Sequence, residues 1–373
     1  MYVAFAVQLS CLRHAKLLQV TVQYSTRTAS KTVVTGIQPT GFPHLGNYYG
    51  MIKPCVKLQD DQNTENFFLL IADLHALTKH ARDDDLTRST LQLAGALMAC
   101  GIDPVVSSDG KHCKGKTILF PQSNIVGHCE LSWILSTKCT VNRLAHLPQW
   151  REKSEAAGES GGSVGLFTYP LLQSADVLLY SADAVPVGID QVTHLELTRD
   201  IARTLLTQWP SLNSFLKVPD IQLTEIPKIH NLREPTMKMS KSIGPESGTI
   251  WLMDTPDEIR LKVSRAQTDS KRELSYDPLS RPGVANLMQI YAASNGIPIA
   301  EAEEKLVKLS KVELKNLVID AIVEELAPIQ ARLKQLETSK LVLDALSAGS
   351  ALANHVALTN LRKIKDVIGL HSF

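Results

Sequence analysis

The feature that most constrains the fold of this chain is a β-branched run that leads through a glycine-rich turn into a helix. Residues 32–35 read Thr-Val-Val-Thr, which is typical of a strand buried in a parallel sheet. The turn at 36–41 is dense in Gly and Pro, and helical periodicity covers residues 48–59. This is the first half of a nucleotide-binding unit, because glycines let phosphate approach the backbone and a helix start offers free N–H groups. The spacing is neither GxGxxG nor a P-loop, so neither a dehydrogenase nor a P-loop ATPase is supported.

The alternation of strands and helices continues through the first two thirds of the chain. Further strands are predicted over residues 66–73, 116–120 and 185–191, and helices over 83–98, 131–135 and 192–208. We therefore expect an α/β catalytic domain over residues 31–245, built on a doubly wound, Rossmann-like parallel sheet. Within it, the polar stretch 107–116 has the composition of an insertion.

The last third of the chain has a helical pattern and no strand signal after residues 251–253. Helices are predicted over 258–266, 300–309, 312–325, 328–337 and 341–368. We therefore expect an all-helical C-terminal domain over residues 246–373. Its basic clusters are predicted to be solvated faces, with contact to an RNA backbone as the alternative (Lys305, Lys308, Lys311, Lys315, Arg362, Lys363 and Lys365).

The first 59 residues contain no Asp or Glu. Residues 1–30 combine Arg13, Lys16 and Arg27 with many Ser and Thr and a scattered apolar pattern. This composition predicts a mitochondrial transit peptide and a location in the mitochondrial matrix, with a disordered start as the alternative. The whole chain carries 39 Lys and Arg against 38 Asp and Glu, so any RNA must be bound by local patches.

Composition excludes several other classes of protein. The chain is 44% hydrophobic and 21% charged, as in a soluble globular protein, and we expect no interaction with a membrane. The six cysteines include no CxxC pair, and the two His-Cys dipeptides fit no standard zinc spacing. We therefore predict free thiols in a reducing compartment and no metal bound by protein side chains.

Three stretches carry candidate chemistry. Lys238 and Lys241 lie on a short polar loop, where two cations can neutralise a polyphosphate that gains charge during a reaction. Residues 44–47, His-Leu-Gly-Asn, open the first helix, and both stretches must converge to act together. Asp176 is a lone acid on a strongly apolar helix, which indicates ligand recognition; a cap or a partner for a buried Arg is the alternative. Asp190 follows a strand and can hold a ribose hydroxyl or cap the next helix.

Four of these stretches appear in the order and spacing of a known family. Residues 36–41, 44–47, 188–191 and 238–242 read GIQPTG, HLGN, GIDQ and KMSKS. Together they resemble the class I aminoacyl-tRNA synthetases, and most closely the tryptophanyl-tRNA synthetases of the bacterial and mitochondrial type. Further matching stretches extend the resemblance from Lys31 to the C-terminus (residues 72–76, 169–170, 175–180 and 281–287).

The resemblance implies a two-step reaction with no covalent enzyme intermediate. ATP and L-tryptophan would form tryptophanyl-adenylate, and the tryptophanyl group would pass to the 2′-hydroxyl of the terminal adenosine of tryptophan tRNA. Mg²⁺ would accompany the ATP phosphates. The resemblance also implies a homodimer, and a helical domain over residues 246–373 that binds the tRNA anticodon.

The resemblance also assigns roles to individual residues. The catalytic set it implies is Lys238, Lys241, His44, Asn47 and Lys153. The ATP site it implies is Gln38, Pro39, Thr40, Gly46, Asn47, Gly188, Ile189, Asp190, Ile229, Lys238, Met239, Ser240, Lys241 and Ser242. The tryptophan site it implies is Asp176, Tyr169, His75, Gln173 and Val34, with Asp176 accepting the indole N–H.

Two residues depart from the family pattern in the amino-acid pocket. Gln173 stands where bacterial relatives often carry Met, and Val34 where some carry Phe, which predicts a more polar pocket wall. A tyrosyl-tRNA synthetase is the nearest alternative, and Gln173 is its only support. A non-catalytic RNA-binding paralogue and a nucleotidyltransferase that adenylates a small acid are further alternatives. Intact His44, Asn47, Lys238 and Lys241 speak against the paralogue, and the helical last third speaks against the nucleotidyltransferase.

Overall fold

The computed structural model describes residues 31–78, 86–107, 113–150, 162–223, 229–240 and 246–371. The predicted transit peptide lies outside these residues. At the centre is a five-stranded parallel sheet in the order β5-β2-β1-β6-β7. Its strands are β1 (Lys31–Ile37), β2 (Thr64–Ile71), β5 (Thr117–Pro121), β6 (Ala184–Val187) and β7 (Asp220–Leu223). The order reverses between β1 and β6, which is the switch point of a doubly wound sheet. The predicted fold class is therefore confirmed.

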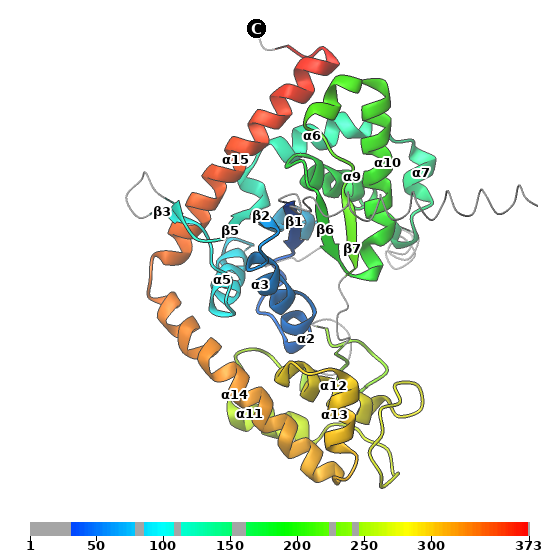
Figure 1. The fold of residues 1–373 in the computed structure, drawn as a ribbon, viewed down its shortest axis with the longest axis vertical. Coiled ribbons are helices and arrows are strands. Elements are labelled where there is room, and N and C mark those ends of the chain that lie inside the picture. The colour runs from blue at the N-terminus through cyan, green and yellow to red at the C-terminus, as the bar shows by residue number, and fades with distance from the viewer. Residues whose placement is uncertain are drawn as a thin grey trace, which may run out of the picture.

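Helices cover both faces of the sheet. Each face needs a cover because successive side chains of a strand point to opposite sides. In β2, Phe67 and Leu69 lie in one hydrophobic core and Phe68 and Leu70 in the other. On the first side lie helices α2 (Leu45–Asn47), α3 (Lys53–Gln59) and α5 (Leu86–Ala99). On the other side lie α6 (Gly127–Ser136), α7 (Val141–Ala145), α9 (Val164–Leu178) and α10 (Val192–Gln208). Figure 1 shows α9 and α10 together beside β6 and β7.

Outside the main sheet, the described chain forms several short elements and then a series of helices. Short elements complete the sheet domain: α4 (Asp73–Ala76), a π-helix (Tyr48–Ile52), 3₁₀ turns (Gln122–Asn124, Ile189–Gln191, Pro210–Ser214 and Glu246–Gly248) and a hairpin of β3 (Val106–Ser107) with β4 (Cys113–Lys114). The helices after them are α11 (Pro256–Ser264), α12 (Pro282–Asn295), α13 (Ile299–Leu306), α14 (Lys311–Glu337) and α15 (Leu341–Ile368). Figure 1 shows α11 to α14 gathered at one end of the molecule. The predicted boundary between residues 245 and 246 stays a prediction.

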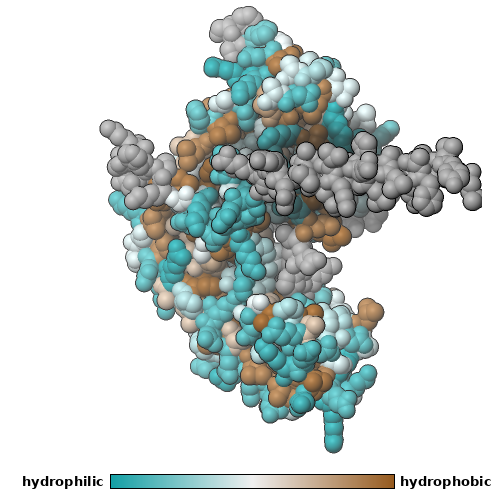
Figure 2. Space-filling view, in the orientation of Figure 1, coloured by the Kyte–Doolittle hydropathy of each residue, from teal (hydrophilic) through white to brown (hydrophobic). Residues whose placement is uncertain are grey.

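Helix α15 returns to the sheet domain and covers the edge strand β5 (Figure 1). Its first half supplies Val342 and Ala345 to one core, and its second half supplies Ala357 and Leu361 to the other. By length and composition alone α15 is apolar enough to cross a membrane, but such helices also occur in the cores of soluble proteins. Here the helix closes an open edge of the sheet. Figure 2 shows hydrophilic residues over much of the visible face, with hydrophobic residues in small groups.

Several predicted elements differ from those observed. The first helix begins at Leu45 rather than residue 48, because His44 caps it, and it passes through a π-helical segment before α3. Residues 312–337 form one helix instead of two, because the buried residues Leu326, Ile329 and Leu333 continue the apolar stripe past Pro328. Strand β7 and helix α12 were not predicted, since neither has a pronounced apolar periodicity.

The insertion and the cysteines complete the comparison. The polar stretch 107–116 forms parts of the β3–β4 hairpin, and residues 108–112 lie outside the described chain. Cys55, Cys100, Cys129 and Cys139 are free thiols, as predicted. Burial raises the pKa of the Cys55 and Cys100 thiols to about 12, so these thiols stay protonated and unreactive.

Candidate active site

A cavity of about 780 Å³ lies at the carboxyl ends of β1 and β6, where the strand order reverses. Doubly wound sheets bind their ligands at this position. Many of the predicted site residues line the cavity: Val34, Gln38, Asn47, His75, Tyr169, Gln173, Asp176, Ile189 and Asp190. The sheet therefore brings together side chains that are up to 156 positions apart in the sequence.

At one end of the cavity, residues 44–47 form a capped helix start. The Nδ1 atom of His44 accepts the N–H of Asn47 at 3.2 Å, and Oδ1 of Asn47 accepts the N–H of His44 at 3.2 Å. This reciprocal capping box fixes both residues. His44 is buried, and its ring meets the edge of Trp251 with centroids 6.0 Å apart. His44 therefore holds the helix start in place, whereas Asn47 faces the cavity.

The lysine loop, residues 237–242, is described as far as Ser240 and lies against this helix start. A Cβ atom on Gly46 would lie 3.5 Å from Cβ of Met239, and Met239 is fully buried. The N–H of Met239 donates to the carbonyl of Ile229 at 3.0 Å, which holds the base of the loop against a buried segment. Lys238 is exposed beside it. The predicted convergence is therefore confirmed for residues 238–240, whereas Lys241 lies outside the described residues.

On the opposite wall, β6 ends in the 3₁₀ turn that carries Asp190. The Nε2 atom of Gln191 donates to the Asp190 carboxylate at 2.8 Å. Helix α10 starts after Gln191, and no side chain caps it. The alternative role of Asp190 as the cap of α10 is therefore wrong. Its carboxylate lines the cavity, where the ribose role predicted from the sequence stays available.

The inner end of the cavity is built around Asp176 on α9. Its side chain is almost completely buried, and its partners are two histidines and an amide. The Nε2 atom of His75 lies 2.8 Å from Oδ2, and Nε2 of Gln122 donates to Oδ1 at 2.7 Å. The Nδ1 atom of His128 lies 2.6 Å from Oδ1. The alternatives of a helix cap or a buried Arg partner are therefore wrong.

These partners keep Asp176 ionised. Burial alone raises the pKa of the carboxyl group, but the charge and hydrogen bonding of His128 and His75 outweigh burial and lower the pKa below its usual value. A buried carboxylate that faces a cavity is suited to accept a hydrogen bond from a neutral N–H donor. The arrangement agrees with the ligand-recognition role that the sequence predicted.

Polar side chains also line the wall between Asp176 and Asp190. The hydroxyl of Tyr169 lies 2.9 Å from Nε2 of His194. The Nε2 atom of Gln173 donates to Oε1 of Gln191 at 3.4 Å. Val34 is buried on the adjoining strand and lines the cavity. The prediction that Gln173 makes the wall more polar is consistent with this contact.

The remaining predicted residues lie around the cavity or outside the described chain. Pro39 and Thr40 follow β1, Gly188 follows β6, and Ile229, Lys238, Met239 and Ser240 belong to the lysine loop and its support. Lys153, Lys241 and Ser242 lie outside the described residues. The sequence predictions missed Gln122 and His128, which contact Asp176, and Gln149 and Gln191, which line the cavity. Gln191 lies in the GIDQ stretch, whereas no local pattern marks Gln122 or His128.

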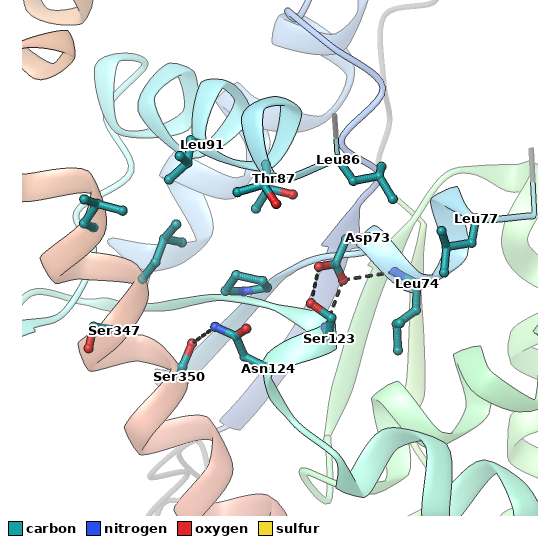
Figure 3. Close-up of a pocket in the computed structure, with 14 residues that line it drawn as sticks. Asp73, Leu74, Leu77, Leu86, Thr87, Leu91, Ser123, Asn124, Ser347 and Ser350 are labelled. Atoms are coloured by element: carbon teal, nitrogen blue, oxygen red, sulfur yellow. Dashed lines mark hydrogen bonds between the residues drawn. The ribbon is translucent and has the colours of Figure 1, made fainter. Parts of the chain in front are cut away.

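A second cavity of about 560 Å³ lies on the other side of α4, between α4, α5 and α15 (Figure 3). Asp73 begins α4 rather than ending β2 as predicted, and its carboxylate accepts hydrogen bonds from the N–H of Leu74 and from both the N–H and the hydroxyl of Ser123. Asn124 donates to the Ser350 hydroxyl at 3.0 Å. The bonds of Asp73 tie the start of α4 to the 3₁₀ turn that carries Gln122, and the bond of Asn124 ties this turn to α15.

The basic clusters of the helical region are largely engaged within the protein. Lys315 donates to the carbonyls of Ser264 and Ala266 at 2.8 and 2.9 Å, at the end of α11. Burial, followed by repulsion from nearby cations, lowers its pKa. Lys305 pairs with Glu301, and Lys365 with Glu130. These three lysines make contacts within the protein, and the alternative role of the basic clusters in RNA contact stays a prediction.

The comparisons with known proteins agree with this geometry. The family model for class I tRNA synthetases of the W and Y group matches residues 26–327. A mitochondrial tryptophan–tRNA ligase of Dictyostelium discoideum is 36% identical, over 91% of this chain and 96% of that protein. A tryptophan–tRNA ligase of Clostridium perfringens is 39% identical, over 91% and 98%.

Solved structures give the same result. The crystal structure of tryptophanyl-tRNA synthetase from Mycoplasma pneumoniae matches with a TM-score of 0.79 at 31% identity, over 92% of this chain and 99% of that one. The enzyme from Campylobacter jejuni, complexed with ADP and tryptophan, matches with a TM-score of 0.72 at 28% identity, over 91% and 100%. The cavity, the motifs around it and these matches together show that the chain belongs to the class I aminoacyl-tRNA synthetases of the tryptophan and tyrosine group.

Proposed function

We propose that this enzyme is a tryptophan–tRNA ligase in which Asp176 selects the amino acid and the lysine loop acts on the ATP phosphates. The observation that carries the proposal is the buried Asp176 carboxylate at the inner end of a cavity whose outer end meets residues 44–47 and the lysine loop. Relatives at 36–39% identity over about nine tenths of the chain are tryptophan–tRNA ligases, which supports tryptophan over tyrosine.

The chemistry requires positioning and charge neutralisation rather than a protein nucleophile. The tryptophan carboxylate attacks the α-phosphorus of ATP, the bond to the pyrophosphate oxygen breaks, and tryptophanyl-adenylate forms. Lys238 and Lys241 would hold the leaving pyrophosphate, with Lys153 as a third cation. Asp190 would hold the ribose, and Gln38 and Asn47 would contact the nucleotide from β1 and from the helix start.

The adenylate then supplies the second step. The 2′-hydroxyl of the terminal adenosine of the tRNA attacks the tryptophanyl carbonyl, and AMP leaves. Within the described residues no three His, Cys, Asp or Glu side chains gather as a metal site. Mg²⁺ would enter with ATP, held mainly by phosphate oxygens, and when bound it would neutralise phosphate charge. Residues 246–373 would bind the anticodon end of the tRNA.

The mitochondrial matrix is the proposed location, supported by the acid-free sequence of residues 1–30 and by the similarity to a mitochondrial relative.

A homodimer is the proposed assembly. Three large apolar residues of α6 and α7 or next to them are more than two thirds exposed: Val126, Trp133 and Val141. Residues Pro148 and Gln149, which follow α7, line the cavity, so a second copy bound here would adjoin the active site.

ATP–pyrophosphate exchange tests the proposed function directly. We expect exchange that depends on tryptophan and not on tyrosine, measured with the protein lacking residues 1–30. Lys241→Ala should reduce the exchange rate by about 100-fold, the effect of losing one charge contact in a transition state. Asp176→Ala should impair the use of tryptophan while the KM for ATP stays unchanged. Exchange that depends on tyrosine would refute the assignment, and unchanged exchange in Lys241→Ala would refute the role of the loop.

A further inference from the structure

The contacts of Asp176 leave one of its acceptor positions free. A carboxylate offers about four lone-pair positions, two on each oxygen. Around Oδ1 lie Nε2 of Gln122 at 2.7 Å and Nδ1 of His128 at 2.6 Å. The contact of His128 is an ion pair, and its angle departs from that of a hydrogen bond. Near Oδ2 only Nε2 of His75, at 2.8 Å, is a partner among the described residues. An incoming N–H donor must therefore bind Oδ2, beside His75.

The geometry also fixes a proton on His128. Its side chain is fully buried, and its Nε2 atom lies 2.9 Å from the hydroxyl of Tyr180. A bare lone pair on Nδ1 would face the Asp176 carboxylate at 2.6 Å, which is repulsive. Nδ1 therefore carries a proton, and the Tyr180 hydroxyl serves Nε2 either as donor to a neutral ring or as acceptor from a charged one.

The surroundings of Asp176 make its contact with His128 necessary if the carboxylate is to stay ionised. Among the described residues no Lys or Arg forms an ion pair with Asp176, so the two imidazoles are its only ion-pair partners there. Aromatic rings surround His128: Phe120 at 6.3 Å and Tyr180 at 5.6 Å between centroids. In such an apolar setting a carboxylate that lost His128 would be costly to keep ionised, and it would bind a proton or turn.

We propose that His128, oriented by Tyr180, is a positioning residue for amino-acid selection: it occupies Oδ1 of Asp176, keeps the carboxylate charged, and so leaves Oδ2 to accept the indole N–H of tryptophan. The inference rests on the proposed function. The three donors come from three elements, α4, the turn at Gln122–Asn124 and α6. The hydrogen bonds between Asp73 and Ser123 (Figure 3) hold the first two of these elements together.

The test compares tryptophan with an isostere that lacks the N–H, 3-(3-benzothienyl)-L-alanine, in ATP–pyrophosphate exchange. The ratio of kcat/KM for the two amino acids measures what the N–H contributes. In His128→Leu we expect this ratio to fall by about 10-fold or more, the effect of weakening a hydrogen bond to a charged group. Tyr180→Phe should lower the ratio less. The KM for ATP should stay unchanged in both variants.

Two further variants separate positioning from general damage. His128→Asn keeps an N–H donor near the place of Nδ1 and should restore a large part of the ratio. The matched control His355→Leu, at an exposed position on α15, should leave the ratio and the rate unchanged. An equal loss of kcat/KM for both amino acids in His128→Leu, or an unchanged ratio, would overturn the proposal. If His128→Leu does not fold, an unchanged ratio in Tyr180→Phe overturns it.

Failure of the proposed function has a different signature. In that case the unaltered enzyme would show no exchange that depends on tryptophan, or would prefer tyrosine. A positive result with the unaltered enzyme and an unchanged ratio in the variants would reject the role of His128 alone.

Discussion

Asn286 on α12 binds both backbone groups of His230, at the base of the lysine loop. Its Oδ1 accepts the N–H of His230 at 2.8 Å, and its Nδ2 donates to the carbonyl of His230 at 2.9 Å. His230 in turn pairs across a β-bridge with Lys238. A single buried amide thus links the helical region to the loop that carries the candidate catalytic cations.

We expect Asn286→Ala to impair the step that uses ATP. The substitution leaves two backbone groups without their partner, at a cost of about 1–3 kcal/mol each, so the loop base should shift. The KM for ATP should rise or the exchange rate fall by about 10-fold or more, while the KM for tryptophan changes little. Asn295→Ala is the control, because that exposed side chain bonds only a carbonyl of its own helix. Equal behaviour of the two variants would contradict the anchoring role.

Glu325 on α14 joins the helical region to the helix that follows residues 44–47. It accepts hydrogen bonds from Tyr48 at 3.1 Å, from Tyr49, and from Nζ of Lys53 at 2.7 Å. Glu325→Ala should lower the free energy of unfolding by about 1.5–3 kcal/mol, the range for hydrogen bonds to a charged group. Urea unfolding measures the loss. Glu324→Ala, at the exposed neighbouring position, should be neutral, and a comparable loss there would refute the assignment.

Gly349 lets α15 cross close to β5. A Cβ atom at this position would overlap the backbone carbonyl of Leu119, which cannot move without breaking the sheet. Gly349→Ala should therefore lower the thermal midpoint by several degrees, corresponding to about 1–3 kcal/mol for overpacking. The matched change Gly95→Ala places its Cβ in ordinary contact with Leu333 at 3.5 Å and should be neutral or stabilising by up to about 1 kcal/mol. An unchanged thermal midpoint in Gly349→Ala would mean that α15 does not cross β5 this closely.

The ion pair of Asp269 with Arg281 predicts a loss of stability in acid. Hydrogen bonding from Arg281 lowers the pKa of Asp269 below its usual value, although partial burial opposes the shift. Because the folded pKa lies below the unfolded value of about 3.9, the contribution is present above pH 4 and is lost as the pH falls toward the folded pKa. The difference in urea midpoint between the unaltered protein and Asp269→Asn should be large at pH 7 and shrink below pH 4. A difference in urea midpoint that does not change with pH would contradict this prediction.

The amino-acid sequence by itself determined the class of fold and the main parts of the site. Alternating apolar runs and glycine-rich turns predicted the parallel sheet, because strand and helix periodicities are local properties of the chain. The position of Asp176 among apolar neighbours indicated a ligand contact, because an acid in such a setting is costly to bury without a specific partner. The stretches at 36–47, 188–191 and 238–242 predicted where the cavity would be, since the carboxyl ends of parallel strands meet at one edge.

Only the tertiary structure decided which groups surround Asp176 and where the last helix lies. Gln122 and His128 reach the carboxylate from separate elements, and no local pattern in the sequence marks a donor that acts across 54 or 48 positions. The return of α15 to β5 depends in the same way on a close backbone approach at Gly349. Long-range contacts of this kind follow from the packing of whole elements, which residue spacing along the chain does not specify.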